Sequence, residues 1–251
     1  MSVSHRESST GPFRDRWAVI TGASSPVGLA VAAHLISIHG MRGVLHCRTH
    51  RRPVVQLIER LRREGLDVSV QVTQADLADP RTLDRWIARV RRQVDRVGVL
   101  FFNAADFYKT PWAQMKWRDF LHMMVLHGWA PIRIVQKLYE KMEPPARIIF
   151  MADAGIEQGY PAYAAYTASK AVMVHWTRLL ARVLSPWITV HAIAPYWIRR
   201  EDESSEPVLS RIARGEPASL AALLRAVDLI LEGGGAMTGQ VLWMDSGRWL
   251  G

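Results

Sequence analysis

The sequence predicts one α/β domain, a Rossmann-type, doubly wound parallel sheet of seven strands with helices on both faces. Seven short apolar, β-leaning runs alternate with helical stretches, which predicts a parallel sheet with its ligand at the carboxyl ends of the strands. The 251 residues, 49% of them apolar, suffice for one large core, and no repeat or linker divides them. The predicted strands are residues 17–21, 43–47, 68–72, 99–103, 147–152, 188–193 and 240–244.

The first strand, the turn after it and the following helix predict a phosphate-binding element. Residues 17–21 lead into the sequence GASSPVG at 22–28, and residues 29–39 form a helical run. Glycines let backbone approach a pyrophosphate, and a helix N-terminus supplies N–H groups and partial positive charge. Glycine pairs also occur in ordinary turns, but the flanking strand and helix favour a dinucleotide site. Its expected contacts are Gly22, Ser24, Ser25, Val27 and Gly28.

The end of the second strand predicts which dinucleotide binds. Sites that prefer NADH place an Asp or Glu there to bind the ribose 2′-hydroxyl. Residues 43–52 contain no acid but include Arg48, Arg51 and Arg52. Arginine binds a 2′-phosphate through charge-assisted, bidentate hydrogen bonds, so we expect NADPH at Arg48 and Thr49. The alternative is an exposed basic loop in an arginine-rich protein.

A tyrosine and a lysine four residues apart predict the proton donor. Residues 161–184 are rich in Ala, Leu and Val and form a predicted helix, so Tyr166 and Lys170 share one face. A free phenol has a pKa near ~10, and a neighbouring cation is expected to lower it toward the working range. The alternative is a surface Tyr and Lys that share a helix face by coincidence.

Further landmarks follow in the order and spacing of one known family. After the glycine turn come an Asp-Leu pair at 76–77, the sequence NAA at 103–105, the Tyr-x-x-x-Lys pair, Pro195 and a last strand-like run at 238–247. Together they resemble the short-chain dehydrogenase/reductase family over nearly the whole chain from residue 17. Pro26 and Tyr196 depart from it, because the family has glycine at both positions. The resemblance implies cofactor contacts at Asp76, Leu77, Asn103, Ala104, Ala105, Lys170 and Pro195.

The same resemblance implies two larger features. A substrate lid is expected at about residues 197–219, where the chain is highly charged. The family commonly forms homotetramers by pairing two long helices, which here correspond to about 117–142 and 161–184. Residues 1–16, polar and without the apolar segment of a signal peptide, are expected to form a mobile tail.

Departures from the family pattern indicate a branch. Asp153 stands where most members have serine, thirteen residues before Tyr166. With Phe107 after the NAA turn and the Arg48-Thr49 pair, it resembles the pteridine reductases and the dihydromonapterin or dihydrofolate reductases. In that branch an aromatic ring stacks on the pterin, which implies a substrate contact at Phe107, with core packing as the alternative. We expect Tyr108 or Tyr196 to extend this apolar wall against a flat ring. His127 corresponds to an asparagine that many members use in a proton relay.

These residues predict an NADPH-dependent oxidoreductase that reduces a C=N bond in a flat pterin or dihydrofolate-like ring. The nicotinamide carries the hydride, Tyr166 donates the proton, and Asp153 binds Tyr166 or a substrate amino group. Pro26 stands where pteridine reductases have a phosphate-binding arginine, which keeps a ketone reductase as an alternative. A catalytically silent nucleotide-binding regulator is a third hypothesis, against which the intact Tyr166 and Lys170 argue.

Composition argues against several other classes. The net charge is +9, but 27 of the 32 basic residues are arginines spread along the chain without a nucleic-acid motif. The sequence contains no uninterrupted apolar run of about 18 residues, so no membrane span is predicted. Cys47 is the single cysteine, so no intramolecular disulfide forms and a cytoplasmic setting is expected. We expect no metal site, because His34, His39, His122 and His175 have no Asp or Cys partner at metal-ligand spacing in the sequence.

Overall fold

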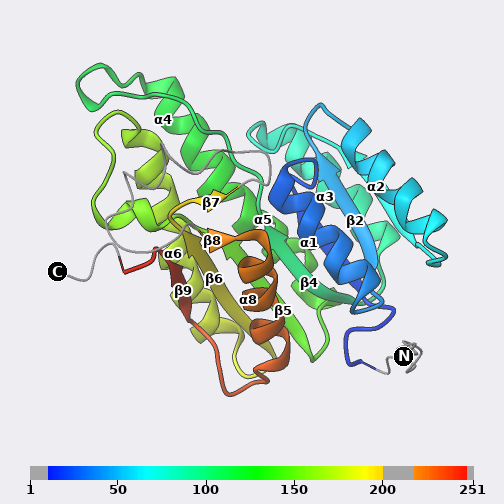
Figure 1. Cartoon of the computed structure of the whole chain (residues 1–251). Coiled ribbons are helices and arrows are strands. Elements are labelled where there is room, and N and C mark those ends of the chain that lie inside the picture. The colour runs from blue at the N-terminus through cyan, green and yellow to red at the C-terminus, as the bar shows by residue number, and fades with distance from the viewer. Residues whose placement is uncertain (1–10, 200–217, 248–251) are drawn as a thin grey trace.

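The computed structural model describes residues 11–199 and 218–247 and is built on one seven-stranded parallel sheet (Figure 1). The strand order is β3-β2-β1-β4-β5-β6-β9, and all neighbouring strands pair in parallel. The strands are β1 (Trp17–Thr21), β2 (Arg42–Cys47), β3 (Val70–Gln74), β4 (Val97–Phe102), β5 (Ala146–Met151), β6 (Ile188–Pro195) and β9 (Val241–Met244). This confirms the predicted fold class and all seven strands. The third strand begins two residues later than expected, because pairing with β2 starts at Val70 opposite Gly43.

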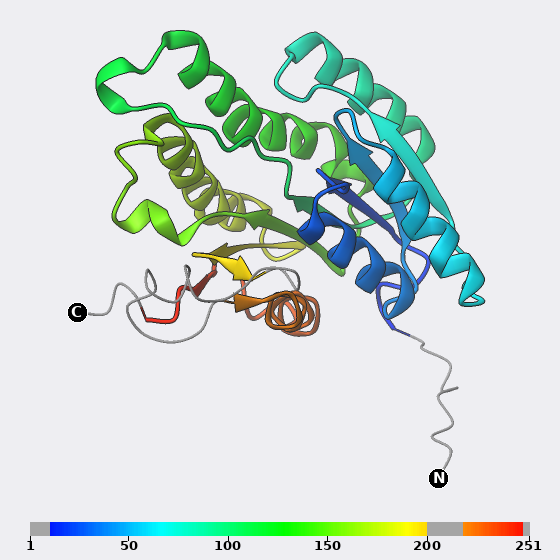
Figure 2. The same ribbon diagram turned by 45° about the horizontal axis from the view of Figure 1, so that its top comes forward.

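Helices cover both faces of the sheet, and each face has its own apolar core (Figure 2). On one face pack α1 (Pro26–Ser37), α2 (Arg52–Arg63) and α8 (Leu220–Glu232). On the other face pack α3 (Pro80–Gln93), α5 (Ala130–Leu138) and α6 (Ala164–Leu184). The strand order reverses between β1 and β4, and in such sheets ligands bind at this switch point, beyond the carboxyl ends of the strands.

The long helix expected at 117–142 is present but is not uniform. It starts as α4 (Trp117–Met123), passes through a π-helical segment at Met124–Trp129, continues as α5 and ends in a 3-10 turn at Tyr139–Lys141. Two further 3-10 turns lie at Trp112–Gln114 and Ala154–Glu157. Single π-helical turns widen the backbone locally and often occur at functional sites.

Residues just before β1 pack against the rest of the domain. Phe13 and Arg16, which precede the predicted domain boundary at residue 17, are buried, and Arg16 donates hydrogen bonds to the carbonyls of Pro144 and Pro145. Residues 1–10 lie outside the described part of the chain, as do residues 200–217 of the expected lid. The described flanks of that lid, β7 (Ile198–Arg199) and β8 (Ala218–Ser219), pair with each other as a two-stranded sheet.

None of the helices in the described ranges combines the length and the apolar character that crossing a bilayer requires.

Candidate active site

The glycine turn after β1 has the geometry of a close backbone approach. Gly22 adopts a φ of +66°, and a Cβ there would lie 2.7 Å from Ala104 Cα. A Cβ on Gly28 would lie 2.4 Å from the Gly22 carbonyl oxygen. Ser25 caps α1, since its Oγ accepts a hydrogen bond of 3.1 Å from Gly28 N, and Pro26 occupies the first helical position without needing a donor. The sequence of this turn therefore brings backbone and a helix N-terminus to one point.

Thr21 and Asn103 lock the ends of β1 and β4 together. Thr21 Oγ1 accepts hydrogen bonds from Asn103 N and Ala104 N, both at 3.1 Å. Asn103 Nδ2 donates to Gly22 O at 2.9 Å and to Ser25 Oγ at 3.1 Å. These bonds hold the glycine turn against the loop after β4, which fixes the floor of the crevice at the switch point.

His46 completes this floor, although no sequence motif indicates a role for it. It is buried at the end of β2, where its Nε2 lies 3.0 Å from Ala75 O and Gly22 N donates to its Nδ1 at 3.4 Å. Burial lowers the pKa of His46 to about 4, against a smaller opposing effect of the Ala75 carbonyl. The ring is therefore neutral, with its proton on Nε2 and its Nδ1 as an acceptor.

A cavity of about 330 Å³ opens above this floor. It has the size of a small-molecule site. Among its lining residues are these expected cofactor contacts: Gly22, Ser24, Ser25, Arg48, Thr49, Asp76, Leu77, Asn103, Ala104 and Ala105. The expected contacts that do not line it are Val27, Gly28, Lys170 and Pro195. Val27 packs against the core and Gly28 lies in the first turn of α1, whereas Lys170 donates to a carbonyl of β5 and Pro195 ends β6.

An acid that the sequence analysis did not single out lies at the rim of the cavity. Asp106 Oδ2 accepts hydrogen bonds from Arg48 Nη1 at 2.5 Å and from His122 Nε2 at 2.8 Å. Burial acts against ionisation, but the two hydrogen bonds prevail and lower the pKa of Asp106. Arg48 thus faces the cavity as a cation already oriented by a carboxylate.

Three of the four histidines that have no acidic partner at metal-ligand spacing in the sequence acquire one in the fold. His122 contacts Asp106, and His34 and His39 both contact Asp228. Each partner is remote in sequence or lies on another element, so only the folded chain brings the groups together. Cys47, by contrast, is buried as expected of a small apolar residue.

Tyr166 and Asp153 meet in the second part of the site. The Tyr166 hydroxyl donates a hydrogen bond of 2.6 Å to Asp153 Oδ2, and Asp153 Oδ1 accepts one of 2.7 Å from Gly155 N. Burial raises the pKa of Asp153 despite these bonds and the nearby charge of Lys170. The Tyr166 phenol and the Asp153 carboxyl group are therefore joined by a hydrogen bond in a position largely shielded from water.

The expectation that Lys170 lowers the pKa of Tyr166 is wrong. Burial, followed by the charge and hydrogen bond of Asp153, raises the pKa of Tyr166 well above its ordinary value. The ammonium of Lys170 is buried, donates a hydrogen bond of 2.6 Å to Met151 O and lies 5.7 Å from the centre of the Tyr166 ring. Burial lowers its own pKa to about 8, against the charge of Asp153. Tyr166 therefore stays protonated, as a proton donor must.

His127 lies behind Tyr166 on the π-helical segment. Its ring meets the Tyr166 ring edge-on, with the centroids 5.8 Å apart. Ser169 Oγ donates to Tyr166 O, so His127 Nδ1 donates to Ser169 Oγ at 2.7 Å. Burial, with a smaller effect of Lys170, holds the pKa of His127 well below its usual range. Its Nε2 is consequently a buried acceptor with no hydrogen-bond partner among the described residues.

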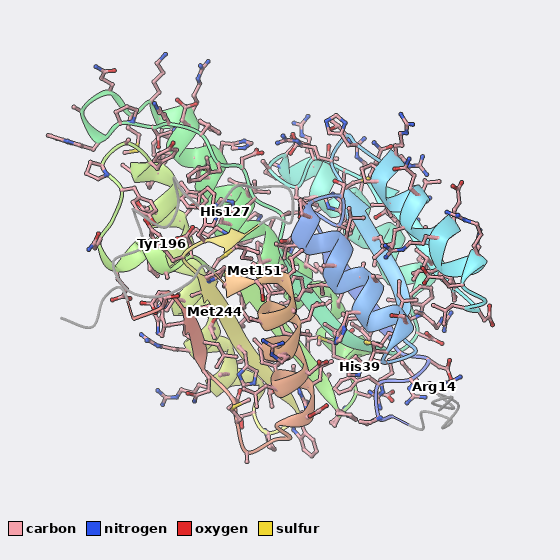
Figure 3. All side chains as sticks on the ribbon, in the orientation of Figure 1. Arg14, His39, His127, Met151, Tyr196 and Met244 are labelled. Atoms are coloured by element: carbon pink, nitrogen blue, oxygen red, sulfur yellow. The ribbon has the colours of Figure 1, made fainter. Side chains whose placement is uncertain are left out.

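Aromatic rings form the outer wall of this second part. Phe107 stacks on Tyr163 with the centroids 4.4 Å apart and the planes within 3°, and it meets Tyr166 edge-on at 4.8 Å. It remains 58% exposed, so apolar ring surface is open beside the Tyr166 hydroxyl. Tyr108 tilts against His122 at 6.4 Å, and Tyr196 against Tyr160 at 6.5 Å. His127, Met151 and Tyr196 lie toward one end of the molecule, and His39 and Arg14 toward the other (Figure 3).

Comparison with known proteins gives a family and two kinds of relative. Residues 16–205 match a family model described as short chain dehydrogenase. A 3-oxoacyl-[acyl-carrier-protein] reductase from Synechocystis sp. is 29% identical and covers 92% of this chain and 95% of its own. A dihydromonapterin reductase from Enterobacter sp. is 28% identical and covers 74% and 75%. A solved structure of landomycin C-6 ketoreductase LanV with bound NADP and rabelomycin superposes with a TM-score of 0.82, at 25% identity and 96% and 99% coverage.

Proposed function

The chain belongs to the short-chain dehydrogenase family, and from that premise we propose that it is an NADPH-dependent reductase of a pterin or dihydrofolate-like ring. The observation that carries the proposal is the hydrogen bond between Tyr166 and Asp153 beside Phe107, whose ring meets Tyr166 edge-on and stays exposed. A flat heterocycle lying on Phe107 would present its ring nitrogen to the phenol. Asp153 is the group that separates this substrate from a simple ketone.

The residues of the cavity fit NADPH. Gly22, Ser24 and Ser25 offer backbone and a helix N-terminus to a pyrophosphate, and Arg48 offers a guanidinium to a 2′-phosphate. Asp106 already orients this guanidinium but leaves it half exposed, so part of the fork remains open to a ligand. When bound, the cofactor supplies the hydride. A LanV structure has NADP bound, which supports the same dinucleotide here.

Asp153 can favour an amino-substituted heterocycle by competition for its oxygen. In the free site the Tyr166 proton points to Asp153 Oδ2. A substrate amino group that donates to this carboxylate competes with the phenol and frees the phenol's proton for the ring nitrogen. A ketone has no such donor. Lys170 then acts on the phenolate that develops as Tyr166 gives up its proton, and so it assists the transition state more than the resting enzyme.

A ketone reductase remains the second candidate, and Pro26 is the observation that favours it. Pro26 lies at the first position of α1, beside the phosphate-binding turn, and has no side-chain donor for a substrate or phosphate. Two of the relatives, the 3-oxoacyl reductase and LanV, are named as ketone reducers. In this case Tyr166 would protonate a carbonyl oxygen.

Turnover by the variant Asp153→Ser separates the two candidates. NADPH oxidation is measured with dihydrobiopterin, dihydrofolate and a panel of ketones, for the wild type, for D153S and for the exposed-residue control Asp67→Ser. We expect kcat/KM for the pterin to fall about 100-fold in D153S, because a charge-assisted hydrogen bond is lost, while ketone turnover persists. Unchanged pterin turnover in D153S, or turnover of ketones alone by the wild type, would contradict the proposal.

For the assembly we propose the homotetramer that the family resemblance implies. Apolar side chains are exposed on the two helices concerned, among them Leu121 and Trp129 near α4 and Leu179 and Val183 on α6. Pairing of these helices would bury them. Solution mass by light scattering tests this, and Val183→Glu should lower the mass if α6 lies in the interface.

A further inference from the structure

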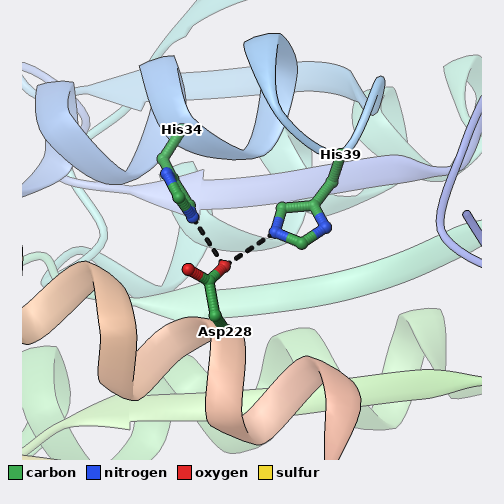
Figure 4. A group of neighbouring side chains, drawn as sticks. All are labelled: His34, His39 and Asp228. Atoms are coloured by element: carbon green, nitrogen blue, oxygen red, sulfur yellow. Dashed lines mark hydrogen bonds and ion pairs between the residues drawn. The ribbon is translucent and has the colours of Figure 1, made fainter. Parts of the chain in front are cut away.

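Two histidines and one aspartate meet on the face of the sheet covered by α1 and α8 (Figure 4). His39 lies toward the end of the molecule opposite to His127 (Figure 3). His34 belongs to the last turn of α1, His39 to the loop that follows, and Asp228 to α8. We propose that these three side chains bind one divalent transition-metal ion, with Zn²⁺ as the representative ion, and that this ion links α1 to α8.

The ligand atoms converge on one point. His34 Nε2 lies 2.6 Å and His39 Nε2 lies 2.8 Å from the same carboxylate oxygen, Asp228 Oδ1. The two rings stand 69° apart with their centroids separated by 5.4 Å, and the three ligand atoms lie within 4.8 Å of one another. Within the described ranges this is the one group of three such side chains that could hold an ion.

The chemistry of the group matches Zn²⁺. Neutral imidazole and carboxylate are common zinc ligands, at about 2.0–2.2 Å, and a tetrahedral ion keeps its ligand atoms roughly 3.3 Å apart. The contacts to Asp228 are about half an ångström shorter than this, as expected when N–H protons occupy the place of an ion. A small outward rotation of the rings would admit the metal. The three side chains are 14%, 17% and 29% exposed, so a fourth position is open to water.

Hydrogen bonds alone could also join these groups, and the place of the cluster shows what an ion would add. His34 follows the cap of α1, Ser25, by nine residues, which is about 13 Å along a helix. The ion would therefore act at the end of α1 opposite to the cofactor turn, as a clamp between two helices, and not on the reacting atoms. An ion that binds the folded chain and not the unfolded one would raise the stability of the whole domain with the logarithm of its free concentration above Kd.

Metal titration of the full chain, purified without a histidine tag and stripped with chelator, tests the proposal. Binding of Zn²⁺ is measured by calorimetry, Co²⁺ by its visible absorption bands, and stability by thermal unfolding. The variants are His39→Gln, Asp228→Asn and, as a control on the exposed face of α6, His175→Gln. We expect one Zn²⁺ per chain and a rise in Tm of roughly 5–10 °C when free Zn²⁺ is about 100-fold above Kd.

The variants decide between a site and incidental binding. H39Q and D228N should lose the Zn²⁺ heat, the Co²⁺ bands and the rise in Tm, while H175Q keeps all three. The metal-free Tm of each variant shows whether it folds, so loss of binding cannot be mistaken for loss of structure. Absence of stoichiometric binding in the wild type, or equal binding by all variants, would overturn the proposal and leave a His–Asp–His hydrogen-bond bridge.

Discussion

The two parts of the candidate site are built from different materials. The cofactor cavity is built on two close-packed turns, which the bonds of Thr21 and Asn103 hold together, and the side chains of Arg48 and Asp106 add charge to its lining. The catalytic part consists of buried polar side chains, Asp153, Tyr166, Lys170 and His127, whose pKa values all depart from their ordinary range. Close packing of turns defines the cofactor part, whereas a buried network of proton donors and acceptors defines the catalytic part.

This difference predicts different responses to change. Substitutions in the cofactor cavity should act through fit, changing stability or cofactor KM. Substitutions in the catalytic part should act through kcat and its pH dependence. Electrostatic interactions are stronger between groups shielded from water, so a change in one group shifts the protonation of its neighbours. Four experiments test this contrast.

The largest effect is expected for Tyr166→Phe. The phenyl ring keeps its contacts with Phe107 and His127, but the proton donor is lost, so kcat should fall by about 10³. The Kd for NADPH should change less than about threefold, because the Tyr166 hydroxyl does not line the cavity. Single-turnover kinetics and fluorescence titration measure the two quantities. Tyr139→Phe, on an exposed turn, is the control, and a Y166F enzyme that retains kcat would remove Tyr166 from the mechanism.

Gly28→Ala should damage the cofactor part next most strongly. Its Cβ would lie 2.4 Å from Gly22 O and 2.7 Å from Ala23 Cα, and both are backbone atoms that cannot rotate away. We expect a loss of about 2–3 kcal/mol in the free energy of unfolding, measured by urea denaturation. Gly235→Ala is the matched control, since nothing lies within 4 Å of a Cβ there. Equal stability of the two variants would show that the turn relaxes and that close packing does not define this part.

Arg48→Ala should produce a smaller effect that is confined to one cofactor. Loss of a charge-assisted contact to the 2′-phosphate raises the KM for NADPH by about 10–100-fold and leaves the KM for NADH nearly unchanged. Steady-state kinetics with both cofactors measure the ratio. The exposed Arg62→Ala controls for loss of general positive charge. A parallel rise in both KM values would mean that Arg48 shapes the loop through Asp106 instead of reading the phosphate.

The sequence predicted local elements better than contacts between residues that are remote in the chain, for a physical reason. A strand, a glycine turn and a helix cap are local signals, and the strand pattern therefore located β1 and its turn closely. Asp106 and His46 were missed because their roles come from contacts made across the sheet. His34 and Asp228 are 194 residues apart, so no spacing rule could join them.

The direction of the pKa shift of Tyr166 differs most clearly from what the sequence pattern predicts. A shared helix face predicts that Lys170 is near Tyr166, but it says nothing about burial. In the fold, Lys170 turns to the Met151 carbonyl and Asp153 takes the hydroxyl, so desolvation prevails over the cation. The π-helical segment that brings His127 behind the ring was equally invisible in the apolar pattern of 117–142.

The smallest effect is expected from pH, and Lys170 provides it. Its pKa in the folded chain is about 8, lowered from 10.5 mainly by burial, so the ammonium loses its charge as pH rises through about 8. Because that charge stabilises the developing phenolate, kcat/KM should fall about fivefold between pH 8 and pH 9. The contribution of Lys170 to folding stability moves the opposite way. Between about pH 8 and 10.5 the unfolded chain binds the proton and the folded chain does not, so this contribution rises with pH.

A pH profile of kcat/KM, with thermal unfolding over the same range, measures both trends. Asp153→Asn is the informative variant, because the charge of Asp153 raises the pKa of Lys170. Without that charge the alkaline limb should move to lower pH, whereas Asp67→Asn should leave it in place. A limb that stays near pH 8 in D153N would assign the titration to another group. The titration of Lys170 would then be less strongly coupled to the charge of Asp153 than the buried contact between Asp153 and Tyr166 implies.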